Sequence, residues 1–222
     1  MTPPAVLSIA GSDPSGGAGV QADLKTFAAH RTYGMGVMTA LTAQSTTGVT
    51  GVHPVPAGFV AEQITTLLDD IPPAAVKVGM LAETDIARAV AGALERVHAP
   101  VVLDPVMVST SGHRLLSAEA EAVVCGALAA RATIVTPNRP EAVVLLAGVD
   151  ARAWVDRTGT ALLLKGGHDT EPIVEDVLFR PGVAPRTWRH PRVKTRNTHG
   201  TGCTLSSAVS YTHLTLPTIC SV

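Results

Sequence analysis

Residues 6–30 read VLSIAGSDPSGGAGVQADLKTFAAH. A short apolar run, Val6–Ala10, leads into a glycine-rich turn, Gly11–Gly19, and an Ala-rich segment with helical spacing of its apolar residues follows from Gly19 to His30. A strand that passes through a turn directly into a helix is the first unit of a parallel sheet with crossover helices. This stretch therefore predicts an α/β fold.

The rest of the chain repeats this alternation. Strands are predicted at Val6–Ala10, Gly36–Ala43, Ala75–Gly79, Val101–Asp104, Thr133–Thr136 and Ala161–Lys165. Helices are predicted at Gly19–His30, Phe59–Asp69, Thr84–Val97, Ser117–Arg131 and Pro140–Ala147. From Ile173 to Val193, strand-like runs with Pro-Gly punctuation predict antiparallel strands at one sheet edge. The 222 residues fit one α/β domain with a mostly parallel central sheet.

Composition excludes several classes of protein. Lys and Arg number 17 against 18 Asp and Glu, and no basic run could bind a phosphate backbone, so nucleic acid is not an expected partner. No apolar stretch reaches the roughly 20 residues of a membrane span, and the N-terminus does not resemble a signal peptide, so we expect no membrane partner and a cytoplasmic location. Cys125, Cys203 and Cys220 lack CxxC spacing, which argues against disulfides or a zinc site.

Residues able to carry chemistry follow the predicted strands. Ligands of open α/β sheets bind outside the carboxyl ends of the strands, so these positions should meet in one cleft. They are Asp13 after the first strand, Gln44 after the second, Met80 after the third, Asp104 at the end of the fourth, Asn138 after the fifth, and Lys165 through His168 after the sixth.

The turn Gly11–Gly19 leaves many backbone N–H groups free to face a ligand. It is not a Walker A loop, because Gly17 and Ala18 stand where Lys and Ser or Thr would follow Gly16. A dinucleotide fingerprint fits poorly, since the next strand ends in Ala-Gln rather than in an acidic residue. Tight packing of strand against helix, without any ligand, remains an alternative.

A second glycine-rich turn, Asn197–Cys203, opens into a segment of helical character. Backbone N–H groups of Thr201, Gly202 and Cys203 at a helix N-terminus would form an anion hole for a phosphoryl group. The same positive end should lower the pKa of the Cys203 thiol, so that it could accept a proton from a substrate hydroxyl. The alternative is a small buried residue at a helix start, as we expect for Cys125 within an Ala-rich helix.

Together these segments resemble the hydroxymethylpyrimidine (phosphate) kinases of thiamine biosynthesis, within the ribokinase-like superfamily. The matching segments are Ala10–Gly19, Gln21–Thr26, Ala43-Gln44, Lys77–Leu81, Leu103–Val106, Thr136–Asn138, Lys165–His168 and Asn197–Cys203, in the family's order and over about residues 5–209. The resemblance implies a three-layer α/β/α sandwich with a mostly parallel sheet and antiparallel edge strands. A Cys after Gly-Thr-Gly is typical of the pyrimidine kinases, where most superfamily relatives carry Asp.

The resemblance also implies site residues. It assigns catalysis to Cys203 as proton acceptor with Gly200, Thr201 and Gly202, substrate binding to Gln44, Asp23, Gly11 and Met80, nucleotide binding to Lys165, Asn138 and Thr198, and Mg²⁺ with its waters to Asp104 and Glu141. A carboxamide such as Gln44 offers a donor and an acceptor to a heterocycle edge. From its position alone, Asp23 is equally an exposed acid of the first helix.

The implied reaction is transfer of the ATP γ-phosphoryl group to 4-amino-5-hydroxymethyl-2-methylpyrimidine, and then to its monophosphate to give the diphosphate. The small-molecule partners would be this pyrimidine and ATP with Mg²⁺, and by analogy a homodimer is expected. One alternative is a pyridoxine or pyridoxal kinase, since related enzymes accept that ring. Another is a non-catalytic pyrimidine-binding remnant.

Two departures from the family pattern keep the remnant open as an alternative. Between Asn138 and Lys165 the chain looks shorter than in relatives, and the segment Gly148–Gly159 leaves little beyond the Pro140–Ala147 helix to cross back to the next strand. From Ser210 onward the Ala-rich helical pattern gives way to Thr residues and Pro217. We therefore expect a kinase domain over residues 1–209, incomplete at its C-terminus, and an unrelated tail over residues 210–222.

Overall fold

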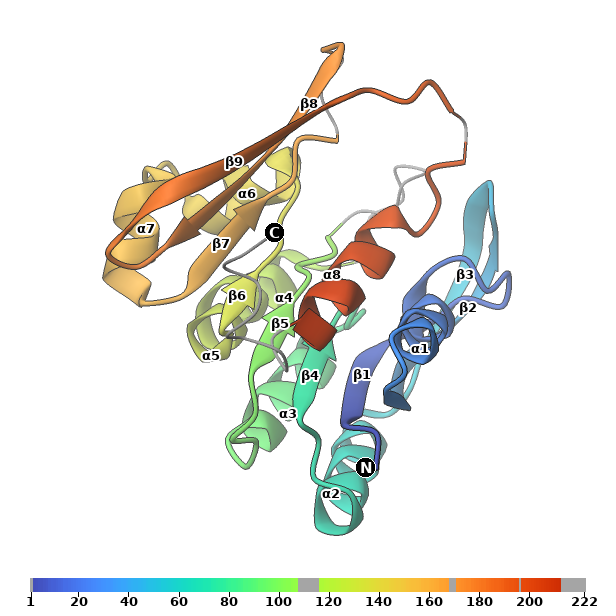
Figure 1. The fold of residues 1–222 in the computed structure, drawn as a ribbon. Coiled ribbons are helices and arrows are strands. Elements are labelled where there is room, and N and C mark those ends of the chain that lie inside the picture. Colours follow the sequence, from blue (N-terminus) through green and yellow to red (C-terminus); the bar gives the residue numbers. More distant parts are fainter. Residues whose placement is uncertain (1, 108–115, 168–170, 196, 213–222) are drawn as a thin grey trace.

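The computed structural model describes residues 2–107, 116–167, 171–195 and 197–212 (Figure 1). Within these ranges the strands form one sheet in the order β3-β2-β1-β4-β5-β6-β7-β8-β9. Their bounds are β1 Ala5–Ser12, β2 Tyr33–Ser45, β3 Gly48–Pro54, β4 Ala75–Val78, β5 Val101–Leu103, β6 Ile134–Val135, β7 Ala161–Leu164, β8 Ile173–Arg180 and β9 Val183–Pro191. The six strands predicted before residue 170 and the antiparallel pair after it are confirmed, with small differences at their ends.

The sheet is parallel in its middle and antiparallel at both edges. Strand β1 pairs in parallel with β2 and β4, and parallel pairing continues through β5, β6 and β7. Antiparallel pairing joins β3 to β2, β8 to β7 and β9 to β8. The carboxyl ends of the parallel strands therefore meet at one edge of the sheet.

Helices cover both faces of this sheet. Their bounds are α1 Gly19–Ala29, α2 Ala57–Asp70, α3 Thr84–Leu94, α4 Ala118–Val123, the π-helical turn η1 Val124–Leu128, α5 Ala129–Arg131, α6 Arg139–Leu146, α7 Ala151–Thr158 and α8 Thr201–Thr212. Helices α1 and α8 lie side by side on one face, whereas α2, α3 and the α4–η1–α5 rod lie on the other (Figure 1). The three layers confirm the predicted α/β/α sandwich. No helix of the described residues is long and apolar enough to cross a membrane.

Two elements were not predicted. Strand β3 contains Gly48, Gly51 and Pro54, and its side chains are half-buried or exposed. Its sequence therefore lacks the clear alternation of apolar and polar residues from which a strand is predicted. Helix α7, Ala151–Thr158, occupies most of the segment Gly148–Gly159, where the sequence predicted no helix. The Asp150 side chain accepts hydrogen bonds from the first backbone N–H groups, and Gly159 ends the helix with a φ of 72°.

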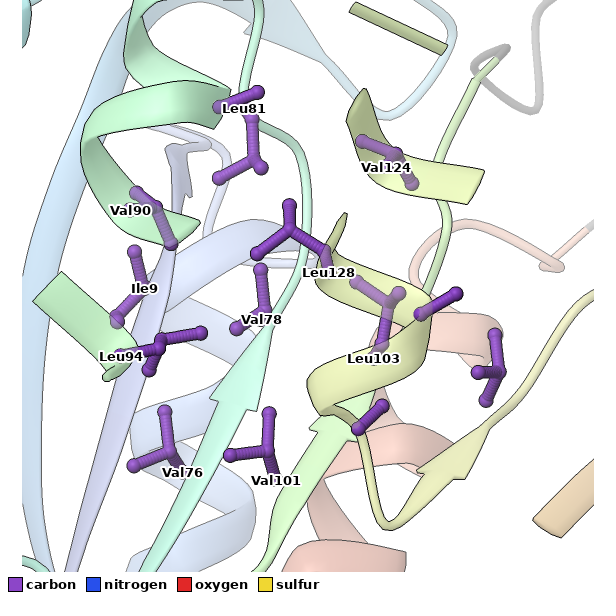
Figure 2. Close-up of a cluster of buried hydrophobic side chains, with 14 of the residues drawn as sticks. Ile9, Val76, Val78, Leu81, Val90, Leu94, Val101, Leu103, Val124 and Leu128 are labelled. Carbon is purple, nitrogen blue, oxygen red and sulfur yellow. The ribbon is translucent and has the colours of Figure 1, made fainter. Parts of the chain in front are cut away.

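The core is aliphatic, as the low aromatic content requires. On the α3 face, strand side chains interlock with those of α3 and the α4–η1–α5 rod (Figure 2). The central members are Ile9, Val76, Val78, Val101 and Leu103 from the strands, Leu81 after β4, Val90 and Leu94 from α3, and Val124 and Leu128 from η1. Their burial fixes the distance between the sheet and this helix layer.

Helix α8 continues further than the sequence suggested. Ser210 is buried and donates a hydrogen bond to the Ser206 carbonyl at 2.9 Å, and the Tyr211 ring stacks on His30 at 4.6 Å between centroids. The helical pattern therefore does not end before Ser210, because packing on α1 holds one more turn. Residues 213–222 lie outside the described residues, and the expected unrelated origin of the tail stays a prediction.

The other face is held by a buried ion pair. The Lys77 ammonium on β4 lies 2.9 and 3.0 Å from the two carboxylate oxygens of Asp23 on α1, and both side chains are 0% exposed. Ser8 on β1 and Ser207 on α8 donate hydrogen bonds of 2.5 and 2.7 Å to the same carboxylate. Burial alone would lower the pKa of Lys77, but the Asp23 carboxylate outweighs it and raises that pKa. Four elements thus share one buried polar junction.

We predict that Lys77→Met lowers the free energy of unfolding by about 3–5 kcal/mol, because it leaves the buried Asp23 carboxylate without its counter-charge. Urea denaturation of both proteins measures this difference. As a control, Arg96→Met removes the exposed ion pair to Asp69 and should change the free energy of unfolding by less than about 1 kcal/mol. Equal effects of the two substitutions would contradict the structural role of Lys77.

Candidate active site

Several of the predicted site residues are in contact at the carboxyl ends of the strands. Asn138 after β6 and Lys165 after β7 form a parallel bridge, and the Lys165 side chain reaches Asp104 at the end of β5. On the β1 side, a Cβ atom added at Gly11 would lie 2.5 Å from the Met80 Cε, so these two predicted substrate positions are in contact. His168 lies outside the described residues.

The glycine-rich turn Gly11–Gly19 is organised around Asp13. One carboxylate oxygen accepts the Ser15 N–H at 2.8 Å, and the other accepts the Ala18 N–H at 2.8 Å and the Ser15 hydroxyl at 2.9 Å. Lys25 on α1 donates to the Gly16 carbonyl at 2.6 Å. The turn is therefore held by its own side chains as well as by strand-to-helix packing.

Asp13 also joins this turn to the second glycine-rich turn. The His199 Nε2 lies 2.7 Å from the Asp13 carboxylate, and that carboxylate is 2% exposed. Burial would raise the pKa of Asp13, but the hydrogen bonds from His199, Ser15 and Ala18 outweigh it and lower that pKa. Gly200 has a φ of 74°, and a Cβ atom there would overlap the Gly17 carbonyl oxygen. The sequence analysis gave His199 no role, since its partner lies 186 residues away.

Thr201, Gly202 and Cys203 form the first turn of α8, as predicted. A Cβ atom added at Gly202 would lie 3.5 Å from the Lys165 Nζ and 3.8 Å from an Asp104 carboxylate oxygen. The predicted anion hole therefore faces the predicted phosphate-binding lysine. Thr198 is exposed, and its carbonyl accepts the Thr201 hydroxyl at 3.0 Å.

The expected lowering of the Cys203 pKa is wrong for the free protein. Burial raises the pKa of this thiol, and the carboxylates of Asp23 and Asp104 raise it further. Lys77 and a hydrogen bond from the Gly19 N–H act in the opposite direction without compensating. The sequence showed the helix N-terminus, but it did not show that the half-buried Cys203 would pack between α1 and the sheet, close to Asp23 and Lys77.

Asp104 and Lys165 form the charged centre of the site. Lys165 donates to one carboxylate oxygen of Asp104 at 2.9 Å, and Thr136 donates to the same oxygen at 3.2 Å. Ser206 on α8 donates to the other oxygen at 3.2 Å. Burial would lower the pKa of Lys165, but Asp104 and then Glu141 outweigh it and raise that pKa, so Lys165 is an ammonium at neutral pH.

Asn138 and Glu141 form a capping box at the start of α6. The Asn138 side chain accepts the Glu141 N–H at 2.9 Å, and the Glu141 carboxylate accepts the Asn138 N–H at 2.8 Å. Burial, followed by the nearby charge of Asp104, raises the pKa of Glu141. Among the described residues no three His, Cys, Asp or Glu side chains are arranged as a metal cage. The carboxylates of Asp104 and Glu141, which lie close enough for the charge of one to affect the other, fit Mg²⁺ that keeps most of its waters.

The Asp23 carboxylate, assigned to substrate binding by the resemblance, is fully buried. Its carboxylate oxygens are filled by Lys77, Ser8 and Ser207, so the alternative of an exposed helix acid is wrong. Gln44, by contrast, is half-buried at the end of β2, and the Thr42 hydroxyl lies 3.0 Å from its amide oxygen. Thr42 in turn donates to the Ser12 carbonyl at 2.7 Å, next to Gly11.

Comparison with known proteins agrees with this architecture. The phosphomethylpyrimidine kinase family model matches residues 13–215. The hydroxymethylpyrimidine/phosphomethylpyrimidine kinase of Salmonella typhimurium is 46% identical over 92% of the chain and 80% of its own length. The thiamine biosynthesis multifunctional protein ThiED of Corynebacterium efficiens is 47% identical over 93% of the chain, which spans only 29% of that relative.

Solved structures show the same fold. The phosphomethylpyrimidine kinase of Clostridium difficile has a TM-score of 0.79 at 37% identity, covering 96% of this chain and 91% of that one. The pyridoxal kinase of Staphylococcus aureus in complex with ADP has a TM-score of 0.86 at 31% identity, covering 97% and 82%. The fold is thus the ribokinase-like sandwich, and with the family model matched over residues 13–215 the chain belongs to the phosphomethylpyrimidine kinase family.

Proposed function

We propose that this protein transfers the γ-phosphoryl group of ATP to 4-amino-5-hydroxymethyl-2-methylpyrimidine and then to its monophosphate, giving the diphosphate used in thiamine biosynthesis. The names of the relatives support this substrate. The observation that carries the proposal is the meeting of the α8 anion-hole turn with the Lys165–Asp104 pair. We place the heterocycle at Gly11, Gln44 and Met80, on the β1–β2 side of the same sheet edge.

The phosphate side of the site neutralises charge. The Lys165 ammonium would contact the phosphates as a point charge, and the N–H groups of Thr201, Gly202 and Cys203 would receive the transferred group. Asp104 and Glu141 would hold Mg²⁺ through its waters. When bound, that ion screens the charge on the phosphate oxygens. Positioning and charge neutralisation dominate phosphoryl transfer, which suits a site built on rigid strand ends.

On the acceptor side, Gln44 would bind the pyrimidine edge and Met80 would form an apolar wall beside Gly11. The hydroxymethyl oxygen would then lie near Cys203. Because burial raises the pKa of this thiol, we propose that the substrates in the assembled complex help it to accept the hydroxyl proton. Phosphoryl transfer with a loose transition state places little demand on a strong base.

A second candidate is a pyridoxal kinase, which the structural likeness to the Staphylococcus aureus enzyme favours. The two candidates separate on substrate preference: kcat/KM with ATP and Mg²⁺ is measured for the hydroxymethylpyrimidine and for pyridoxal. We expect the pyrimidine to be preferred. One of the two reasons for the non-catalytic alternative is weakened, because the segment Gly148–Gly159 forms helix α7.

We predict that Cys203→Ala lowers kcat in a coupled assay by about 100-fold or more, the usual effect of removing a positioned proton acceptor. The KM values for ATP and pyrimidine should change little. Cys125→Ala is the matched control, since this cysteine lies in η1 within the opposite helix layer and should affect stability alone. An unchanged kcat in Cys203→Ala would overturn the assignment.

The contact between the two glycine-rich turns leads to another prediction. Asp13→Asn keeps the shape of the side chain but weakens its charged hydrogen bond to His199, so the anion hole should shift relative to the Gly11–Gly19 turn. Displacement of this kind should lower kcat by about 10- to 100-fold. Asp85→Asn, at an exposed position on α3, is the control. Equal kcat values for both variants would show that the link has no role in turnover.

The buried thiol also predicts a pH profile of alkylation. Because a raised pKa reduces the thiolate fraction at a given pH, iodoacetamide should modify Cys203 more slowly at pH 7.5 than a free cysteine peptide, with the rate still rising above about pH 9. Cys125, whose pKa burial raises to about 11, should behave similarly. Peptide mass spectrometry reports each site separately. A Cys203 rate that levels off below about pH 8 would show a lowered pKa instead.

A further inference from the structure

The hydrogen bonds around Thr42 determine which end of the Gln44 amide faces the pocket. Thr42 and Gln44 are two residues apart on β2, and their side chains are in contact although the pairing of β2 with β3 is irregular between Ala43 and Gln44. The Thr42 Oγ1 is 2.7 Å from the Ser12 carbonyl oxygen and 3.0 Å from the Gln44 Oε1. Both side chains are half-buried.

A hydroxyl carries one proton and cannot donate fully to two acceptors. The Ser12 carbonyl can only accept, and it is the closer partner, so the Thr42 proton goes there. The lone pairs of Thr42 Oγ1 then face the Gln44 amide. The two ends of an amide have nearly the same shape and are distinguished by their hydrogen bonds, so we infer that the Gln44 Oε1 and Nε2 exchange places and that the NH₂ end lies next to Thr42. The amide oxygen then lies on the opposite side, where the proposed function places the heterocycle.

The neighbouring Gln21 follows the same rule. The backbone N–H of Asp13 can only donate, and it does so to the Gln21 amide oxygen at 2.8 Å. The Gln21 NH₂ group therefore faces the Ser12 hydroxyl, at 2.7 Å. A backbone group thus fixes the orientation of each amide. The Asp13 N–H, which can only donate, orients Gln21, and the Ser12 carbonyl, which can only accept, orients Gln44 through Thr42.

We propose that Thr42 is a specificity-determining residue, which turns the Gln44 amide oxygen toward the ligand and so selects heterocycles that present an amino group to it. The second proton of the Gln44 NH₂ group remains available to an adjacent ring nitrogen. An amino group beside a ring nitrogen satisfies both positions, whereas a ring without the amino group leaves the amide oxygen without a donor. This inference rests on the proposed function and defines the substrate class of the same site.

The first experiment needs no ligand. Hydrogen exchange of the Gln44 side-chain amide is followed by NMR, with the resonance assigned by its loss in Gln44→Met. We expect one of its two protons to exchange slowly in the wild type, where it bonds to Thr42, and both to exchange rapidly in Thr42→Val. Fast exchange of both protons in the wild type would overturn the inference, because the NH₂ group would then face the open pocket.

The second experiment measures selectivity. The ratio of kcat/KM values is determined for 4-amino-5-hydroxymethyl-2-methylpyrimidine and for its analogue without the amino group. In Thr42→Val, the loss of one oriented hydrogen bond should reduce this ratio by about tenfold. The change should come mainly from a higher KM for the amino compound, and the KM for ATP should change little. Thr42→Ser, which keeps the hydroxyl, should restore the ratio.

Thr50→Val is the matched control. Thr50 lies on β3 and donates to the Ala43 carbonyl at 3.0 Å rather than to the Gln44 side chain, so its loss should leave the ratio unchanged. A fall in activity with an unchanged ratio in Thr42→Val would show a merely structural threonine and overturn the inference. If the wild type neither binds nor phosphorylates the pyrimidine, the proposed function fails, and the exchange experiment still decides the amide orientation.

Discussion

The Asp23–Lys77 ion pair is the interaction on which the rest of this structure depends. A carboxylate and an ammonium that are both withdrawn from water are stable only when their remaining hydrogen-bonding capacity is filled, and Ser8 and Ser207 fill it. These four residues come from α1, β4, β1 and α8. These contacts hold helix α8 in one position on the sheet. The position of the anion-hole turn at the N-terminus of α8 is fixed with it.

Two further contacts fix the same turn from its open side. Ser206 binds Asp104, which also pairs with Lys165, and His199 binds Asp13 in the first glycine-rich turn. The charged groups of the site are thus part of the framework that places them. This explains why Asp104, assigned to Mg²⁺ from the resemblance, already accepts several hydrogen bonds: its carboxylate both orients α8 and adds negative charge beside the phosphate site.

Burial and local electrostatics compete at Cys203, and burial prevails in the free protein. A helix N-terminus favours the thiolate by a modest amount, since its effect is confined to the first turn. Enclosure by α1 and the sheet opposes any charge on the sulfur, and two nearby carboxylates add to that effect. Catalytic competence at this position therefore depends on the assembled complex with its substrates rather than on a thiol that is already activated.

The sequence by itself determined the α/β class, the parallel order of the strands, the two glycine-rich turns and the gathering of Gln44, Asp104 and Lys165 at one sheet edge. Apolar periodicity and strand-to-turn transitions are local signals that survive without tertiary contacts. Helix α7 was readable in principle from Asp150 and Gly159, but its burial through Trp154 and Val155 depends on the sheet beneath it. Only the tertiary structure decided that Asp23 is buried, that His199 meets Asp13 and that Cys203 is shielded. Each of these depends on residues far apart in the chain, whose desolvation and pairing no local pattern records.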